Sequence, residues 1–271
     1  MSLLRRFAKV LPSSLRYRLT SLLWSQMDLS AQVDGRLRLT VQGRTDWDTL
    51  NELFVKGEYD HAIYSTIGGN TNGCDTVLRV LDLGGNVGFF ALRVCALATA
   101  LSVPLEMLHV VSVEGSRRNY ARLVASANRW RSAWPSFQCI HGLVGERTGS
   151  AFLYDTTAHV TTTTKGYGSG EQVTFFDLTT LLSNESEWDL IKCDIEGAEQ
   201  DFLSNYGDLL RCTKRIVIEF HHELVDLELC RRILREAGYA GPRLLSQGDT
   251  PTGKRSVEFY TRLTGGEPDP L

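Results

Sequence analysis

Acidic residues and glycines stand directly after several short apolar runs, where they are suited to bind a ligand or to move a proton. Asp82 is followed by a glycine-rich turn, Glu114 ends a second apolar run, and Asp194 and Glu196 follow a third. Carboxylates bind hydroxyl groups and accept protons, and glycines let the backbone approach a ligand closely. These residue types together predict a site for a hydroxylated ligand.

The glycine-rich turn lies within the sequence VLDLGGNVGFF, at residues 80–90. Gly84, Gly85 and Gly88 remove side chains where a predicted strand turns into a helix, so that backbone can approach a ligand at the helix N-terminus. The GxGxxG pattern of dinucleotide-binding proteins is missing, which speaks against a pyrophosphate ligand. A nucleoside cofactor without phosphates fits better, with Asp82 holding the turn or meeting an ammonium group of the ligand through water. The alternative is a plain tight turn between strand and helix.

Two further acidic motifs follow predicted strands. Glu114 precedes the helix-like stretch SRRNYARL, and a carboxylate at that position can accept both hydroxyls of a ribose, unless it is simply a solvated glutamate. In WDLIKCDIEGAEQDFL, at residues 188–203, acids follow a buried strand with no intervening loop. Glu199 is suited to the N-terminus of a helix, whereas Asp194 is placed to face both cofactor and substrate.

The segment IVIEFHHE ends another predicted strand with two histidines. Strand alternation puts Glu219 and His221 on one face and His222 on the other. Histidine has a nearly neutral pKa and suits general base chemistry, so the candidate proton acceptors are Asp194, His221 and His222. A divalent metal held by Asp194, Glu219 and His222 is a less favoured alternative, and either histidine can equally have a structural role.

From residue 76 onward, short apolar runs alternate with helix-length stretches. This order predicts an α/β fold with a mostly parallel central sheet flanked by helices. In such sheets, ligands bind outside the carboxyl ends of the strands, where the acids and glycines above all lie. We expect strands over residues 77–82, 108–114, 136–142, 188–193, 215–221 and 256–262.

Three segments do not follow this alternation of predicted strands and helices. The sequence VDGRLRLTV, at residues 33–41, alternates around a DG turn and predicts a small hairpin. Residues 46–60, DWDTLNELFVKGEYD, predict a helix that ends near Gly57 and caps the domain. Residues 151–176 contain the stretch TTAHVTTTTKGYGSG, which is polar and glycine-rich and predicts a mobile loop over the site.

The length of 271 residues predicts one main domain, over residues 61–271, with a helical and hairpin appendage over residues 1–60 that caps the acceptor site. A hydrophobic fraction of 42% with 23% charged residues is typical of a soluble globular protein. The net charge of -3 does not favour a nucleic-acid partner. The six cysteines include no CxxC pair, which predicts reduced thiols and a cytoplasmic location.

The segment before Asp28, MSLLRRFAKVLPSSLRYRLTSLLWSQM, is basic and contains no acid. Arg16 and Arg18 interrupt its apolar residues, which argues against a signal peptide, and the chain has no apolar run of about 18 residues that would cross a membrane. Two alternatives remain. The segment is an amphipathic helix that contacts an anionic membrane surface or an acidic partner, or it packs on the main domain with its arginines in water.

Together these motifs resemble the FkbM family of methyltransferases, a branch of the class I enzymes that depend on S-adenosylmethionine. The resemblance covers roughly residues 46–262. Two positions depart from the family pattern: Gly115 stands where proline is frequent, and Cys193 where a hydrophobic residue is usual. The similar passages are, in order, KGEYD, DLGGNVGFFAL, VEGSRRNYARL, GLVGERTGSAFLY and DLIKCDIEGAE.

The resemblance implies a Rossmann-like class I fold, S-adenosyl-L-methionine as cofactor, and methyl transfer, usually to a hydroxyl oxygen of a sugar, glycolipid, polyketide or other natural product. It implies that Glu114 binds the ribose, that Leu143 and Val144 lie near the adenine, and that Asp194 also borders the cofactor. The methionine end would be lined by Asp82, Gly84, Gly85, Asn86 and Gly88.

Three other functions stay open from the sequence. An N-methyltransferase would use the same fold with an amine acceptor. An NAD-dependent oxidoreductase would share the general architecture, although the missing GxGxxG pattern speaks against it. A protein that binds the cofactor without turnover would keep the pocket and lack an acceptor.

Overall fold

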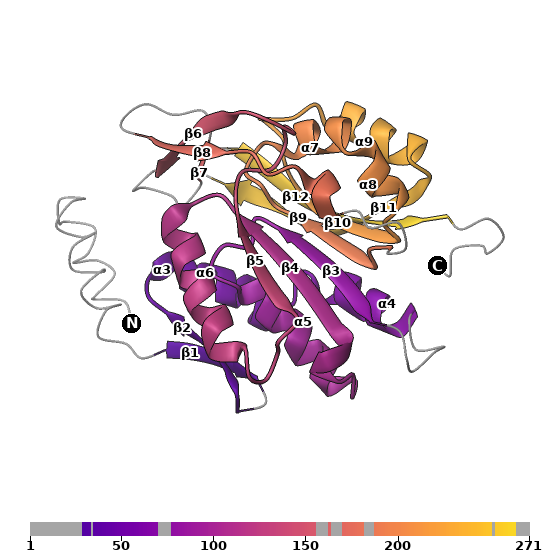
Figure 1. Cartoon of the computed structure of the whole chain (residues 1–271). Helices are drawn as coiled ribbons and strands as arrows, with labels where there is room; N and C mark the ends of the chain where they lie inside the picture. Colours follow the sequence, from indigo (N-terminus) through magenta and orange to yellow (C-terminus); the bar gives the residue numbers. More distant parts are fainter. Residues whose placement is uncertain are drawn as a thin grey trace, which may run out of the picture.

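A computed structural model (Figure 1) describes residues 29–33, 35–69, 77–155, 162–163, 170–181, 187–250 and 253–263. Within these ranges, no helix is long and apolar enough to cross a membrane. The basic N-terminal segment and most of the polar stretch over residues 156–170 lie outside the described residues, so both predictions stay open there.

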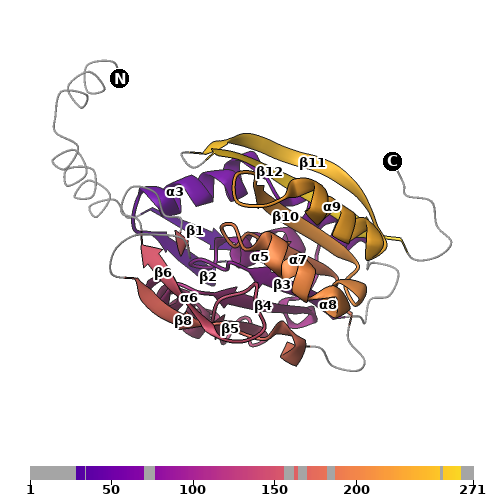
Figure 2. The same cartoon turned by 90° about the horizontal axis from the view of Figure 1, so that it is seen from above.

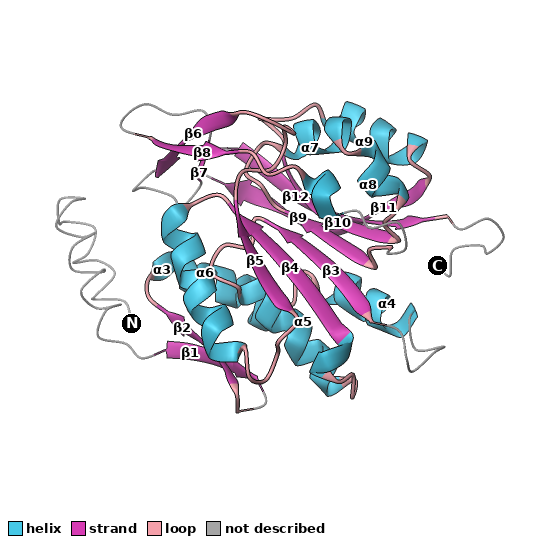
Figure 3. Ribbon diagram, viewed as in Figure 1, coloured by secondary structure: helices cyan, strands magenta, loops and turns pink. Residues whose placement is uncertain are grey.

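The centre of the fold is a seven-stranded sheet (Figure 3). Its strands are β3 (Leu78–Leu83), β4 (Leu108–Glu114), β5 (Phe137–His141), β9 (Leu190–Cys193), β10 (Arg215–His221), β11 (Tyr239–Thr250) and β12 (Gly253–Arg262). They lie in the order β11-β12-β10-β9-β3-β4-β5. The five strands from β10 to β5 are parallel, and β12 and β11 each run antiparallel to their neighbours. The predicted α/β fold with a mostly parallel sheet is confirmed.

Helices cover both faces of the sheet (Figure 2). One face carries α4 (Asp60–Gly69), α5 (Phe89–Ala100) and α6 (Arg117–Trp130), and the other carries α7 (Glu199–Asn205), α8 (Gly207–Arg211) and α9 (Leu227–Glu236) (Figure 1). Alternate strand residues build the two cores, with Val80 and Val217 buried on the α5 face and Leu81 and Ile216 on the α7 face. Short 3-10 turns, η2 (Leu105–Met107) and η3 (Leu178–Leu181), complete the connections.

The N-terminal part of the described chain packs on the first of these cores. β1 (Leu29–Val33) and β2 (Leu37–Val41) form the predicted hairpin, and their apolar residues join the core beside α5 and α6. α3 (Arg44–Leu50) continues directly into a π-helical turn, η1 (Asn51–Lys56). This helix ends at Gly57, whose φ of 65° is the left-handed conformation that glycine adopts most easily, so the predicted stop is confirmed.

The structure differs from the sequence-based expectation in two segments. Residues expected to form a loop instead form a three-stranded sheet of β6 (Ser150–Asp155), β7 (Thr162–Thr163) and β8 (Glu171–Thr174). Leu153 and Val173 of this sheet pack against Leu143, so apolar residues at alternate strand positions attach the small sheet to the main domain. The strand β11 was not predicted, because two register shifts and two glycines, Gly241 and Gly248, break its alternation.

Candidate functional site

A pocket opens at the carboxyl ends of β3, β4 and β9, where parallel-sheet proteins bind ligands. Three carboxylates, those of Glu114, Asp194 and Glu196, contribute to its wall. Among the described residues that line it, none is a lysine, arginine or histidine. The remaining lining is polar or apolar: Gly84, Asn86, Val113, Gly115, Ser116, Asn119, Gly142, Leu143, Val144, Leu153, Ile195 and Ala198.

The glycine-rich turn brings two strand ends into direct contact. Gly84 has a φ of +79°, and a Cβ atom at this position would lie 1.8 Å from the backbone oxygen of Asp194. Gly85 faces away from the pocket, where a Cβ atom would lie 2.8 Å from the Cβ of Ser112. Gly88, with a φ of 102°, immediately precedes α5. Only Gly84 of the three borders the pocket, and the other two allow the turn to pack.

Asp82 lies beneath this turn and is completely buried. Its carboxylate accepts a hydrogen bond of 2.9 Å from the Ser112 hydroxyl and lies 3.4 Å from the ammonium nitrogen of Lys192. Burial raises the pKa of Asp82, and the Lys192 charge opposes that shift. Of the two roles that the sequence left open, the geometry favours holding the turn, because the carboxylate does not border the pocket.

Glu114 ends β4 and borders the pocket, as the sequence predicts. Its Oε2 accepts from the backbone N–H of Asn86 at 2.7 Å, and its Oε1 accepts from the backbone N–H of Ser116 at 2.8 Å. Each oxygen keeps a second lone pair for a ligand hydroxyl. Burial raises the pKa of Glu114 to about 7, against the two backbone hydrogen bonds that lower it. The arrangement suits a ligand with two neighbouring hydroxyl groups.

Apolar side chains form the next part of the wall. Leu143 and Val144 follow β5, and Leu153 comes from the small sheet; each is less than a tenth exposed. A Cβ atom on Gly115 would lie 2.8 Å from the Cδ2 atom of Leu143, so glycine is the residue that fits at this position. A flat apolar ring can lie against this surface.

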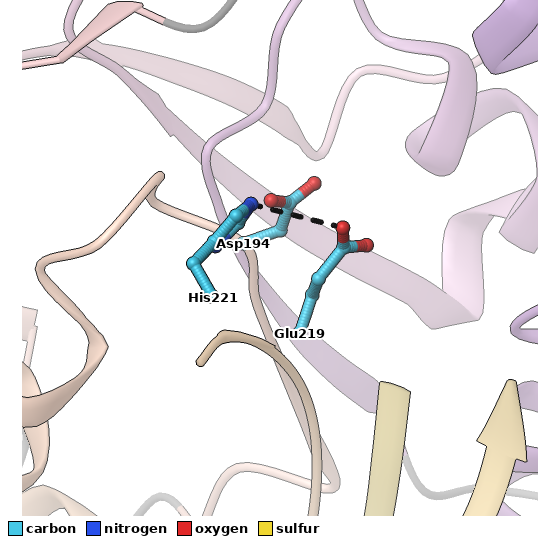
Figure 4. A group of neighbouring side chains, drawn as sticks. All are labelled: Asp194, Glu219 and His221. Carbon is cyan, nitrogen blue, oxygen red and sulfur yellow. Dashed lines mark ion pairs between the residues drawn. The ribbon is translucent and has the colours of Figure 1, made fainter. Parts of the chain in front are cut away.

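At one side of the pocket, Asp194 points toward Glu219 and His221, which do not line it (Figure 4). The His221 ring lies between two other carboxylates, with Nδ1 3.0 Å from Glu199 and Nε2 3.1 Å from Glu196. Burial alone would lower the pKa of His221, but these hydrogen bonds raise it to about 11. The imidazole is therefore charged at neutral pH, and the prediction that His221 acts as a general base is not supported.

Glu219 connects this group of side chains to residues from distant parts of the chain through hydrogen bonds and ion pairs. It accepts from Arg255 at 2.7 Å and from the Tyr59 hydroxyl at 3.2 Å, and Arg255 also contacts Glu52 and Glu58. Burial and the neighbouring Asp194 carboxylate raise the pKa of Glu219 to about 8. Asp194 and Glu196 are both partly exposed and part of the pocket wall, but Glu196 is paired with His221, whereas the nearest cation to Asp194 is Lys192 at 3.5 Å.

His222 does not belong to this group. Strand alternation turns it to the α9 face, where its Nε2 lies 2.8 Å from the Ser256 hydroxyl, which in turn contacts the buried Glu258. His222 therefore lies apart from the other candidate proton acceptors and from the group that could share an ion, which is Asp194, Glu219 and His221 among the described residues.

The metal alternative changes accordingly. The described residues that could share an ion are Asp194, Glu219 and His221, whose ligand atoms lie within 4.8 Å of one another. Their charges are already compensated, because Lys192 lies 3.5 Å from Asp194 and Arg255 binds Glu219. An ion would also have to displace the proton from a strongly basic His221. A divalent metal therefore stays the less favoured alternative.

A second, polar groove lies between η1 and β11. It shares Glu52, Glu58 and Arg255 with the network around Glu219, so it adjoins the acid group. The Ser246 hydroxyl donates to Glu58 across this groove. Its other polar side chains are Asp48, Asn51, Lys56, His61, Arg243, Gln247 and Asp249.

The contribution of Lys192, Tyr59 and Arg255 to the site was not predicted from the sequence. A lysine within the apolar run LIKC was a usable signal, because lysine is rarely buried without a partner. Tyr59 and Arg255 gave no such signal, since their role depends on contacts between segments far apart in the chain.

Residues 108–240 match the family model described as the methyltransferase FkbM domain. A comparison with curated protein sequences gives no match. Among solved structures, magnesium protoporphyrin IX methyltransferase (ChlM) from Synechocystis PCC 6803, with bound S-adenosylmethionine, is 13% identical, with 89% of each chain covered and a TM-score of 0.48. The N-terminal domain of EvdMO1, with bound S-adenosylhomocysteine, is also 13% identical, covers 94% of this chain and 98% of its own, and has a TM-score of 0.47.

Proposed function

We propose, from the premise that this chain is a methyltransferase with an FkbM domain over residues 108–240, that it transfers a methyl group from S-adenosylmethionine to a hydroxyl oxygen. The acceptor class that we propose is a sugar, glycolipid, polyketide or other natural product. A cytoplasmic location is part of this proposal, and the free cysteines of the described chain are in keeping with it.

The observation that carries the cofactor assignment is the charge of the pocket wall. Three carboxylates line it, and no basic side chain does, among the described residues. A dinucleotide carries phosphates that such a wall repels, whereas S-adenosylmethionine carries no phosphate and has a positive sulfonium. Glu114 is placed to accept both ribose hydroxyls, and the Leu143 and Leu153 surface is suited to the adenine.

The reaction needs the acceptor oxygen to be aligned with the donor and to lose its proton as attack proceeds. When bound, S-adenosylmethionine supplies the methyl group as an electrophilic carbon. Asp194 is our candidate for the group that accepts the proton, because it borders the pocket, is 29% exposed and, unlike the equally exposed Glu196, is not hydrogen-bonded to His221. The charged His221 orients Glu196 and Glu199 at the start of α7 and keeps this wall in place.

We place the acceptor in the polar groove between η1 and β11, which adjoins the acid group through Arg255. Its amide, carboxylate and hydroxyl side chains suit a hydroxylated small molecule or glycan. The mixed charges of the groove do not favour nucleic acid. N-methyl transfer is the second candidate function, since the acidic side chains around Asp194 would also attract a positively charged amine.

Calorimetric titration tests the cofactor assignment. S-adenosylhomocysteine should bind the full-length protein with saturation, whereas NAD should not compete at equal concentration. Preferential binding of NAD would overturn the assignment. With a panel of hydroxyl and amine acceptors, release of S-adenosylhomocysteine on the hydroxyl compounds alone supports O-methylation, and release on the amines alone would replace it with N-methylation.

Replacing Glu114 with glutamine should weaken S-adenosylhomocysteine binding about 10- to 100-fold, as expected for the loss of hydrogen bonds to a charged group. The wild-type affinity should rise as the pH increases toward about 7 and level off above it, because Glu114 must lose its proton for both oxygens to accept ribose hydroxyls. The variant should lose this pH dependence. An unchanged pH profile in Glu114→Gln would show that another group titrates.

The stability of the free protein should have the opposite dependence on pH. The pKa of Glu114 is raised from 4.5 to about 7 on folding, so the folded state holds the proton more tightly. This group therefore lowers the free energy of unfolding as the pH rises between those values.

A further inference from the structure

Lys192 is a charged residue in the middle of the sheet, where most positions are apolar. It lies on β9, in register with Asp82 on β3 and Val217 on β10, and is 4% exposed. Its side chain lies on the same face as Asp82 and Asp194, next to the Phe90 ring of α5. Lys192 does not border the ligand pocket itself.

The ammonium group contacts two segments at the base of the pocket, the turn after β3 and the residue that follows β9. It donates to the backbone oxygen of Gly84 at 2.9 Å and lies 3.4 Å from that of Leu83. It also lies 3.5 Å from the Asp194 carboxylate. The Leu83 oxygen accepts from the backbone N–H of Asp194 as well. One cation therefore ties the glycine-rich turn to the end of β9.

Stability of the fold alone does not account for this lysine. Burying an ammonium group is costly, and an apolar side chain of the same length would often stabilise a sheet more. Burial would lower the pKa of Lys192, but the Asp194 and Asp82 carboxylates raise it above its usual value. The group therefore stays charged and cannot serve as a base.

We propose that Lys192 is a positioning residue, which holds the Gly84 carbonyl and the Asp194 carboxylate at a fixed separation across the pocket floor. This inference rests on the proposed function, since the groups that it fixes border the site for cofactor and acceptor. Preorganised groups bind a ligand without having to be ordered first. The rival explanation is that Lys192 only compensates the buried charge of Asp82.

A double variant separates the two explanations. Lys192→Met leaves Asp82 buried without its cation, so it should lower the unfolding temperature and weaken S-adenosylhomocysteine binding. Asp82→Asn combined with Lys192→Met removes both charges and should recover most of the unfolding temperature. If Lys192 positions the two strand ends, this double variant should still bind S-adenosylhomocysteine about 10- to 100-fold more weakly than both the wild type and the single variant Asp82→Asn, because the contacts to Gly84 and Asp194 stay absent.

The chain offers a matched control in the pair of Lys214 and Asp189, whose charged atoms are 2.8 Å apart at the opposite end of the sheet. Lys214→Met should lower the unfolding temperature with no change in S-adenosylhomocysteine affinity. Wild-type affinity in the double variant would overturn the positioning role, as would failure of both Lys192 variants to fold. If the wild-type protein itself binds no S-adenosylhomocysteine, the proposed function fails, which is a different result.

Discussion

Replacing Gly84 with alanine should abolish S-adenosylhomocysteine binding and lower the stability of the protein by about 3 kcal/mol. The added Cβ atom would lie 1.8 Å from the backbone oxygen of Asp194, so β3 and β9 would have to separate at the pocket floor. The φ of +79° adds strain of about 1–2 kcal/mol for any residue with a Cβ atom. Calorimetric titration and thermal unfolding measure the two effects.

Gly35→Ala is the control for backbone strain. Gly35 also has a positive φ, +66°, but a Cβ atom there would meet nothing within 4 Å. This variant should lose about 1 kcal/mol of stability and bind S-adenosylhomocysteine normally. If Gly84→Ala binds the ligand as well as Gly35→Ala does, the close contact between Gly84 and Asp194 has no part in ligand binding.

Replacing Asp194 with asparagine should slow methyl transfer about 100- to 10,000-fold, the range that a positioned general base contributes. The affinity for S-adenosylhomocysteine should change only a few-fold, because asparagine keeps the shape of the side chain. Release of S-adenosylhomocysteine is followed with the acceptor that turns over fastest in the panel described above. Asp208→Asn, at an exposed ion pair on α8, should keep the wild-type rate.

Two outcomes would remove Asp194 from this role. A normal rate in Asp194→Asn would show that another group accepts the proton. Glu219 would then be the next carboxylate to replace, since its pKa of about 8 suits a general base at neutral pH. A large loss of cofactor affinity in the same variant would instead assign Asp194 to ligand binding. The two readouts together distinguish a base from a binding group.

The sheet and the cofactor side of the site could be predicted from the sequence because both depend on local patterns. Apolar runs marked each parallel strand, and the residue after each run marked the ligand edge. Glu114, Gly84 and Asp194 accordingly meet in one pocket. Gly85 and Gly88, which were predicted beside the cofactor, do not line the pocket. A glycine can be required for packing as well as for binding a ligand, and the sequence does not distinguish the two.

The acceptor side could not be predicted in the same way. Alternation along β10 separated His221 from His222, but it does not indicate which carboxylates surround each ring. The high pKa of His221 follows from Glu196, in the turn after β9, and from Glu199, the first residue of α7. The contacts of Lys192 could not be predicted either. A single lysine in an apolar run indicates that an acidic partner exists, but it does not identify Asp82 and Asp194 as the partners.

The Arg255 network has a consequence for how the molecule assembles. The hydrogen bond from Asn86 to Glu114 joins residues 28 apart in the chain, whereas that from Arg255 to Glu52 joins residues 203 apart. Closing the longer loop costs roughly 2 kcal/mol more in chain entropy. The two halves of the site are therefore unequal in folding, since the Glu114 side of the cofactor pocket closes over 28 residues, whereas the acceptor half is complete only when both ends of the domain have met.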